Sequence, residues 1–272
     1  MTLLPEHERV KKPEESKIGT QVSNELETFL SAPSSYDPKT TAEKLTAMVE
    51  QETKDDPDNY APHFIYDEIL YRVRIVTHDD PQQEKLVKLL AAIKEIRSSK
   101  FGADYWHSLD PLGLSIRELW NGELRENSVD SWASLNAFSA RLAQVELLNL
   151  DDYAIWAMRY SLENGTLGKV SEVTGQVKEG ELNPAVLDAH IPAAAVWIFY
   201  ARSLIWQLSQ KNADASASTR GGPTWNGSAG YSVERWNFWK ERLEYFSERD
   251  DLTEKTRSMA RRAKELMENV GQ

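Results

Sequence analysis

Apolar residues recur at intervals of three and four along most of the chain. In the first half they fall on the helical period in three successive groups. The groups are Leu45, Met48 and Val49, then Phe64, Ile65, Ile69, Val73 and Val76, then Leu86, Leu89, Leu90, Ile93 and Ile96. No segment alternates apolar and polar residues cleanly enough for a strand. The pattern therefore predicts an all-α protein.

Short capping signals predict where helices begin and end. Asp37-Pro38, Asp80-Pro81 and Asn183-Pro184 each place a capping side chain before a proline at the first helical position. Asn164-Gly165 is a typical helix stop. Two amphipathic helices are expected at the C-terminal end, over about 232–249 and 252–270. Ser232 is the expected N-cap of the first, and Asp251 with Glu254 has capping-box spacing at the start of the second.

The most apolar run is I-P-A-A-A-V-W-I-F-Y-A-R-S-L-I-W-Q-L, residues 191–208. It is short for a membrane span and carries Arg202 and Gln207, which favours a buried central helix. The whole chain then predicts a single compact multi-helix domain over 20–272, an irregular antiparallel array of about nine or ten helices. Residues 1–19 are charged and contain two prolines, and they are expected to form a disordered N-terminal arm.

The glycine-rich connection over 211–231 is predicted to be a flexible loop. Its stretch G-G-P-T-W-N-G-S lacks the lysine and the preceding strand of a phosphate-binding loop, so a lid or a linker remains. Trp225 distinguishes these alternatives, because a lid would dock it against Trp197 or Trp206. A second loop is expected over 165–182.

Charge and cysteine content exclude several classes of function. The chain has 43 acidic and 32 basic residues and a net charge of −11, which argues against nucleic acid and anionic membranes as partners. The absence of cysteine excludes disulfides, thiolate nucleophiles and cysteine-ligated metals. The N-terminal residues lack the apolar core of a signal peptide, so a cytoplasmic protein is expected.

The acidic pairs Asp55-Asp56, Asp79-Asp80 and Asp151-Asp152 all fall at predicted helix starts. They are interpreted as capping and helix-dipole residues. No two histidines are spaced i, i+4, and no G-x-S-x-G sequence is present. We therefore expect neither a metal site nor a cofactor.

Tryptophan is abundant, with nine residues. Six of them lie in the most apolar helices, where they form either a tryptophan-rich core or the wall of a pocket. On the helix through Trp197, helical projection places Tyr200, Ser203 and Gln207 on one polar stripe. Arg159 and Glu163 are spaced i, i+4 and could pair. Arg235, Arg242 and Arg249 recur at heptad spacing; they could stack on aromatic rings or reach acids of an adjacent helix, but they are interpreted as surface residues.

Several stretches resemble a known family. They are W-A-S-L-N-A-F-S-A-R-L, R-Y-S-L-E, P-A-A-A-V-W-I-F-Y-A, E-R-W-N-F-W-K-E-R-L and L-T-E-K-T-R-S-M-A-R-R-A-K-E-L-M. They are similar to a family of fungal proteins that carry a domain of unknown function, over about residues 25–270. The resemblance implies an all-helical, cytosolic protein with a link to specialised metabolism, because some members lie in natural-product gene clusters. It implies no catalytic residue.

Two functions remain. The first is a cofactor-independent cyclase or isomerase of fungal specialised metabolism. It would fold an apolar polyene, terpenoid or polyketide in an aromatic-lined pocket, for example for an intramolecular Diels-Alder reaction. Tyr200, Gln207 and Arg159 would be its catalytic donors. The pocket would be formed by Trp132, Trp156, Trp197, Ser203, Trp206, Trp225 and Trp236. The alternative is a non-catalytic helical scaffold that binds a protein partner, and the oligomeric state is open.

Overall fold

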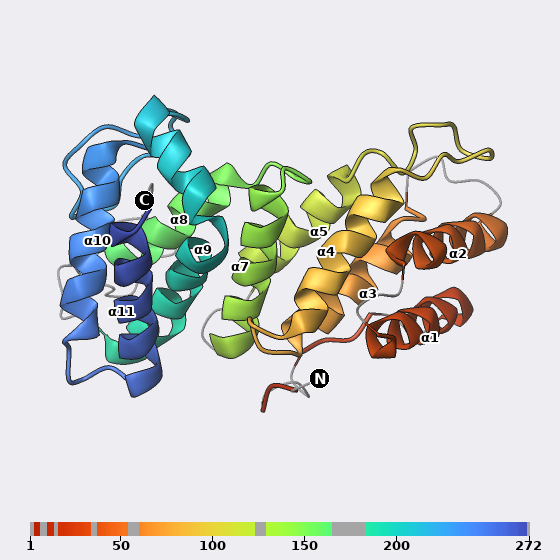
Figure 1. The fold of residues 1–272 in the computed structure, drawn as a ribbon, viewed down its shortest axis with the longest axis horizontal. Helices are drawn as coiled ribbons and strands as arrows, with labels where there is room; N and C mark the ends of the chain where they lie inside the picture. Colours follow the sequence, from red (N-terminus) through yellow and green to blue (C-terminus); the bar gives the residue numbers. More distant parts are fainter. Residues whose placement is uncertain are drawn as a thin grey trace. The chain divides into compact units, whose positions relative to one another are not determined.

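The computed structural model describes residues 3–5, 10–13, 16–33, 37–53, 60–122, 129–164 and 183–270. These residues form ten helices and no strand, which confirms the all-α prediction (Figure 1). The helices group into two compact units, residues 1–124 and 125–272, which together cover the predicted helical region. The predicted loop over 165–182 lies outside the described residues.

Unit 1 contains five helices among its described residues. They are α1 (Lys17–Ser31), α2 (Pro38–Glu52), α3 (His63–Arg74), α4 (Pro81–Lys94) and α5 (Asp110–Asn121). Helix α2 packs on α1 and α4, and α3 packs on α1, α4 and α5. The core of this unit is built from the predicted apolar positions, since Leu45, Ile69 and Leu90 are completely buried.

The predicted N-terminal arm over 1–19 lies partly outside the described residues. Among those described, the Leu4 N–H donates to the Ile75 carbonyl at 2.8 Å. Val10 packs with Ile75 and Val76 after the end of α3. Helix α1 begins at Lys17.

Unit 2 is built around its longest helix. Its helices are α7 (Val129–Gln144), α8 (Asp151–Leu162), α9 (Pro184–Lys211), α10 (Val233–Ser247) and α11 (Glu254–Glu268). Helix α9 packs against each of the other four, and Figure 1 shows it between α7 and the pair α10 and α11. It is long and apolar enough to cross a membrane, but 72% of its most apolar stretch is buried inside the protein. The predicted buried central helix is thus observed.

The local capping signals mark helix starts where they were predicted. Asp37, Asp80 and Asn183 each accept a hydrogen bond from a backbone N–H of the first turn, and Ser232 caps α10 in the same way. The prediction for α11 was wrong, because Thr253 is the N-cap and accepts from the Thr256 N–H. Asp251 instead pairs with Arg249 and is not available as a cap.

A buried ion pair joins α8 to α10 and to the loop between α9 and α10. Arg235 of α10 and Glu163 at the end of α8 are both fully buried, and the Nε–Oε1 distance is 2.6 Å. The Trp239 indole and the Gly222 N–H also donate to Glu163, at 2.6 and 2.7 Å. The carboxylate therefore accepts four hydrogen bonds, two at each oxygen.

Arg235 is equally well satisfied. Besides its two bonds to Glu163, its guanidinium donates to the carbonyls of Thr219 (2.8 Å), Gly230 (2.7 Å) and Arg220 (3.3 Å). These contacts use all five N–H groups of an arginine. The sequence interpretation of Arg235 as a surface residue was therefore wrong, and Glu163 pairs with it rather than with Arg159.

Replacing Arg235 should destabilise the protein severely. Arg235→Met leaves the Glu163 carboxylate buried without its cation, and we expect the free energy of unfolding to fall by about 3–5 kcal/mol. Urea denaturation followed by circular dichroism measures this change. Arg249→Met is the matched control. Arg249 follows the end of α10, and its pair with Asp251 is exposed. A loss below about 1 kcal/mol for Arg235→Met would contradict a structural role of the pair.

Candidate functional site

The connection between α9 and α10 runs along α8, and we call its residues 213–231 the strap. Near the start of α8, the Ser218 hydroxyl donates to Asp152 at 2.9 Å. One turn farther, the Trp156 indole Nε1 donates to the Ser218 carbonyl at 3.0 Å. At the other end of α8, Gly222 bonds to Glu163. The strap therefore contacts α8 from its first turn to its C-terminal cap.

The two ends of the strap meet beside the start of α8. The Tyr231 N–H donates to the Ala213 carbonyl at 2.8 Å, and the Tyr231 hydroxyl donates to the Asp151 carbonyl at 2.9 Å. Gly230 makes this closure possible, because it adopts a φ of 80°. A Cβ atom there would lie 2.4 Å from the Ala213 carbonyl oxygen.

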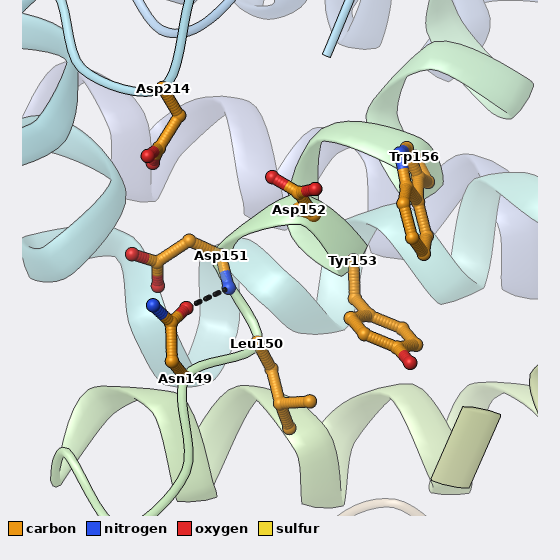
Figure 2. A pocket seen from close by; sticks show the side chains of 7 residues that line it. All are labelled: Asn149, Leu150, Asp151, Asp152, Tyr153, Trp156 and Asp214. Carbon is orange, nitrogen blue, oxygen red and sulfur yellow. Dashed lines mark hydrogen bonds between the residues drawn. The ribbon is translucent and has the colours of Figure 1, made fainter. Parts of the chain in front are cut away.

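A cavity of about 280 Å³ lies where the strap crosses the first turn of α8 (Figure 2). Six of its lining residues come from the start of α8 and the turn before it, and Asp214 comes from the strap. The lining residues are Asn149, Leu150, Asp151, Asp152, Tyr153, Trp156 and Asp214. None of them is basic.

Carboxylates dominate this cavity, which we call the acidic pocket. Figure 2 shows the carboxylates of Asp151 and Asp214 facing each other, with Asp152 beside them. Burial, together with repulsion from Asp214, Asp152 and Glu146, raises the pKa of Asp151 to about 6. Burial and repulsion from Asp152 also raise the pKa of Asp214. The described residues form no ion pair with any of the three lining acids, so their repulsion is not neutralised.

Two aromatic rings form another part of the wall. Tyr153 and Trp156 lie with their ring centroids 4.8 Å apart and their planes inclined by 50°. The bond from Trp156 to the strap fixes the orientation of its indole. An acidic pocket with electron-rich rings attracts cations, since carboxylates supply charge and ring faces supply a favourable quadrupole.

Metal ions and organic cations differ in the geometry that they require. Among the described residues no group of three or more His, Cys, Asp or Glu side chains is arranged to hold a metal ion. An ammonium or guanidinium group needs no fixed coordination geometry and can donate hydrogen bonds to several carboxylates at once.

Unit 1 contains a smaller cavity and, among its polar clusters, one formed by His63, Asp67 and Ser115. The cavity, of about 160 Å³, is lined by Phe29, Pro33, Pro38, Pro81, Glu84, Lys85 and Lys88. In the cluster, the Ser115 hydroxyl donates to Asp67 at 2.8 Å and lies 3.1 Å from Nδ1 of His63. A catalytic triad places the imidazole between hydroxyl and carboxylate. Here the hydroxyl lies between the other two groups, which is not the order of a catalytic triad. The cluster instead links α3, which carries His63 and Asp67, to α5, which carries Ser115.

The three residues of the predicted polar stripe on α9 lie in different environments. Tyr200 is half-buried beneath the Arg141 guanidinium, 3.5 Å from the ring centroid, whereas Ser203 and Gln207 are exposed. The helix is kinked between Tyr200 and Ser203, at Ala201, which has a non-helical φ of −135°. Neither cavity described above is lined by any of the three.

Arg159 and the predicted wall tryptophans lie in several parts of unit 2. Arg159 donates to the Ser218 and Arg220 carbonyls at 3.1 and 3.2 Å and so holds the strap. Trp132 and Trp197 are buried, and the Trp197 indole donates to Asn136 at 2.9 Å. Only Trp156 lines the acidic pocket.

The other three predicted wall tryptophans, Trp206, Trp225 and Trp236, lie on or near α10. Trp206 and the buried Trp236 contact each other with ring centroids 5.3 Å apart. Trp225 packs against Phe238 of α10, at 5.4 Å between centroids, and its indole donates to the Ser228 carbonyl. Trp225 therefore docks on α10 rather than on Trp197 or Trp206, the contacts expected of a lid.

The sequence analysis missed the acidic pocket. Asp151 and Asp152 were interpreted only as helix-start acids, a position that the structure confirms for both. Tyr153 and Asp214 carried no signal that linked them to this helix start. Asp214 is 62 residues farther along the chain than Asp152, so only the folded strap brings it to the pocket.

Substituting Gly230 should destabilise the closure of the strap. Gly230→Ala combines a left-handed backbone with a clash against Ala213 and should cost about 1–3 kcal/mol of the free energy of unfolding. Gly102→Ala is the control, because Gly102 has a φ of 104° but open space around it. Urea denaturation compares the two variants. Equal losses would show that the close approach to Ala213 contributes nothing.

Removing one acid should stabilise the protein at neutral pH. Because the pKa of Asp151 is raised in the folded protein, the folded state binds a proton at this carboxylate more tightly than the unfolded state does. The free energy of unfolding therefore falls as the pH rises from about 4 to about 6. Asp214→Asn reduces this repulsion and should raise the free energy of unfolding by about 0.5 kcal/mol at pH 7.5, with no gain at pH 4. Chemical denaturation at both pH values measures the difference. A destabilised variant at pH 7.5 would contradict mutual repulsion.

Comparison with known proteins places the chain in a family. Searches of curated proteins and of solved structures found no similar protein. The sequence profile described as "Protein of unknown function (DUF3632)" matches residues 66–243, from α3 of unit 1 into α10 of unit 2. This match covers more than half of the chain, and it agrees with the resemblance to a domain of unknown function. The chain therefore belongs to the DUF3632 family.

Proposed function

We propose that this protein is a non-catalytic helical scaffold that binds a protein partner, and that it takes a basic side chain of that partner into the acidic pocket. The observation that carries the proposal is the lining of the pocket. Asp151, Asp152 and Asp214 surround one cavity together with the rings of Tyr153 and Trp156, and no lysine or arginine lines it.

The size and opening of the pocket suit a side chain better than a larger ligand. Its volume of about 280 Å³ is at the lower limit of small-molecule sites, which range over about 300–1,000 Å³. Asp152 and Tyr153 are half-buried and Asp214 is exposed, so a partner can reach them from solvent. A lysine or arginine side chain fits these dimensions.

Electrostatics favour a basic partner at long and at short range. The net charge of −11 attracts positively charged proteins and accelerates their encounter. Within the pocket, a cation replaces repulsion among the acids by attraction to each of them. An arginine would gain most, since its planar guanidinium binds carboxylates in a bidentate manner and stacks on aromatic rings.

The cyclase hypothesis has less support. An enzyme that folds a polyene, terpenoid or polyketide needs an enclosed apolar cavity, whereas the described pocket is acidic and open. Of its proposed donors, Arg159 bonds to the strap, Tyr200 is half-buried beneath Arg141, and Gln207 is exposed. A role in fungal specialised metabolism remains a hypothesis that rests on family resemblance. A cytoplasmic location is a hypothesis that rests on the N-terminal sequence and on the same resemblance.

Binding of a model side chain tests the proposal. N-acetyl-arginine amide is titrated into the ¹⁵N-labelled full chain at pH 7.5, and the Trp156 indole N–H resonance is followed. We expect saturable shifts with a Kd of about 1 mM, which corresponds to about −4 kcal/mol. Asp151→Asn combined with Asp214→Asn should weaken binding at least about tenfold, because two charge-assisted contacts are lost.

Two controls make the result specific. N-acetyl-glutamine amide has a similar size without the charge, and Glu241→Gln removes an exposed acid of α10 outside the pocket. Neither should reproduce the effect of the cation or of the double substitution. Equal shifts with the neutral amide, or undiminished binding to the double variant, would refute a cation site in this pocket.

A further inference from the structure

We propose that the acidic pocket is one end of a longer binding surface, and that its partner presents a basic residue next to a polyproline II helix. The basic residue enters the pocket, and the prolines lie on a track of aromatic rings along α8, which we call the aromatic track. The track consists of Tyr153, Trp156 and Tyr160. The basic residue rests on the proposed function, whereas the prolines do not.

The three rings lie on one side of α8. Their spacing of three and four residues places them on the same helical face, and each is only partly buried. Asp152 and Arg159 lie on the neighbouring face, where both bond to Ser218 of the strap. Figure 2 shows the rings of Tyr153 and Trp156 on the same side of the acidic pocket. The aromatic track therefore begins in the pocket and runs along α8 beside the strap.

Each ring of the track is held in place by a different contact. The Trp156 indole donates to the Ser218 carbonyl at 3.0 Å, and Tyr153 packs against Trp156 with ring centroids 4.8 Å apart. Tyr160 stacks on the buried His190 of α9, with ring centroids 6.1 Å apart and planes inclined by 25°. Rings that are already fixed lose little conformational entropy when a ligand binds.

The shape and charge of this surface favour a proline-rich segment with a basic end. Tyr160 does not line the acidic pocket, so beyond the pocket the track offers a ring face to a ligand. Polyproline II segments dock on aromatic surfaces of this kind, and their preformed conformation keeps the entropic cost of binding low. The three acids of the pocket require a positive charge at one end of the segment.

The dimensions of α8 and of a polyproline II helix agree. Asp152 and Tyr160 are eight residues apart, which corresponds to about 12 Å along the helix axis. A polyproline II helix extends by about 3.1 Å per residue, so about four residues span this distance. Prolines three and four positions away from a basic residue therefore reach Tyr160 while the basic residue occupies the pocket.

Arg159 supplies hydrogen-bond donors beside the track. A polyproline II helix makes no internal hydrogen bonds, so its carbonyls need donors from the protein or from water. Nη1 of Arg159 donates to the Ser218 and Arg220 carbonyls, and the guanidinium lies 5.6 Å from the ring centroid of Tyr160. Its Nε and Nη2 groups donate to none of the residues that the structure describes, so they are available to a peptide carbonyl.

Short peptides titrated into the ¹⁵N-labelled full chain at pH 7.5 test the aromatic track. The probes are acetyl-Arg-Ala-Ala-Pro-Pro-amide and the reversed sequence acetyl-Pro-Pro-Ala-Ala-Arg-amide, because a polyproline II helix can lie in either direction. We expect the better of the two to bind about tenfold more tightly than N-acetyl-arginine amide, with a Kd of about 0.1 mM. Nuclear Overhauser effects should connect its proline protons to the Tyr160 ring.

Glycine peptides and one pair of variants provide the controls. Replacing both prolines by glycine should remove the tenfold gain in affinity, and so should Tyr160→Leu. Tyr245→Leu replaces an exposed tyrosine of α10 and should keep the gain. If circular dichroism shows that Tyr160→Leu does not fold, the comparison of proline and glycine peptides on the unsubstituted chain decides. Equal affinities of these peptides in both directions would overturn the track.

A peptide with glutamine in place of arginine separates the track from the proposed function. If arginine peptides bind but the prolines add no affinity, the cation site stands and the track is refuted. If the glutamine and arginine forms of the proline peptide bind equally well and contact Tyr160, the track stands and the cation site fails. If no peptide binds, both are refuted.

Discussion

The ion pair between Glu163 and Arg235 holds the strap against α8, beside the acidic pocket. A buried pair of charges is costly to desolvate, and it is tolerated here because each donor and acceptor has a partner. Three of the guanidinium bonds go to backbone carbonyls of the strap rather than to a side chain. The pair thereby determines the path of an otherwise irregular segment along α8, and that path brings Asp214 opposite Asp151.

Charged groups of the described residues are paired on the buried side of the strap and unpaired on its solvent side. On the buried side, opposite charges are matched and all their hydrogen bonds are made. On the solvent side, Asp151, Asp152 and Asp214 lie together without a counterion among the described residues. Unfavourable interactions of this kind are common where a ligand, rather than the folded chain, supplies the missing partner. The acidic pocket is for this reason a better candidate for function than the buried aromatic residues.

The fold was predictable where its determinants are local. Asp37, Asp80 and Asn183 cap their own first turns, so dipeptides were sufficient to place three helices. The kink at Ala201, between Tyr200 and Ser203, was not predicted, because no proline stands at that position. The acidic pocket and the pair of Glu163 with Arg235 depend on contacts between distant segments. Arg235, Arg242 and Arg249 recur at heptad spacing, and this pattern gives no sign that Arg235 alone is fully buried. Asp151 resembles an ordinary helix-start residue until the strap is in place.

Arg235 does not line the acidic pocket, but its bonds to the strap hold one side of it. Arg235→Lys keeps the positive charge beside Glu163 but cannot bind the strap carbonyls and the carboxylate together. The decisive measurement is the Kd of N-acetyl-arginine amide for Arg235→Lys at pH 7.5, under conditions where circular dichroism shows an unchanged helix content. The account predicts binding about tenfold weaker than in the unsubstituted protein, because Asp214 is no longer held opposite Asp151. An unchanged Kd would contradict the dependence of the pocket on the buried pair.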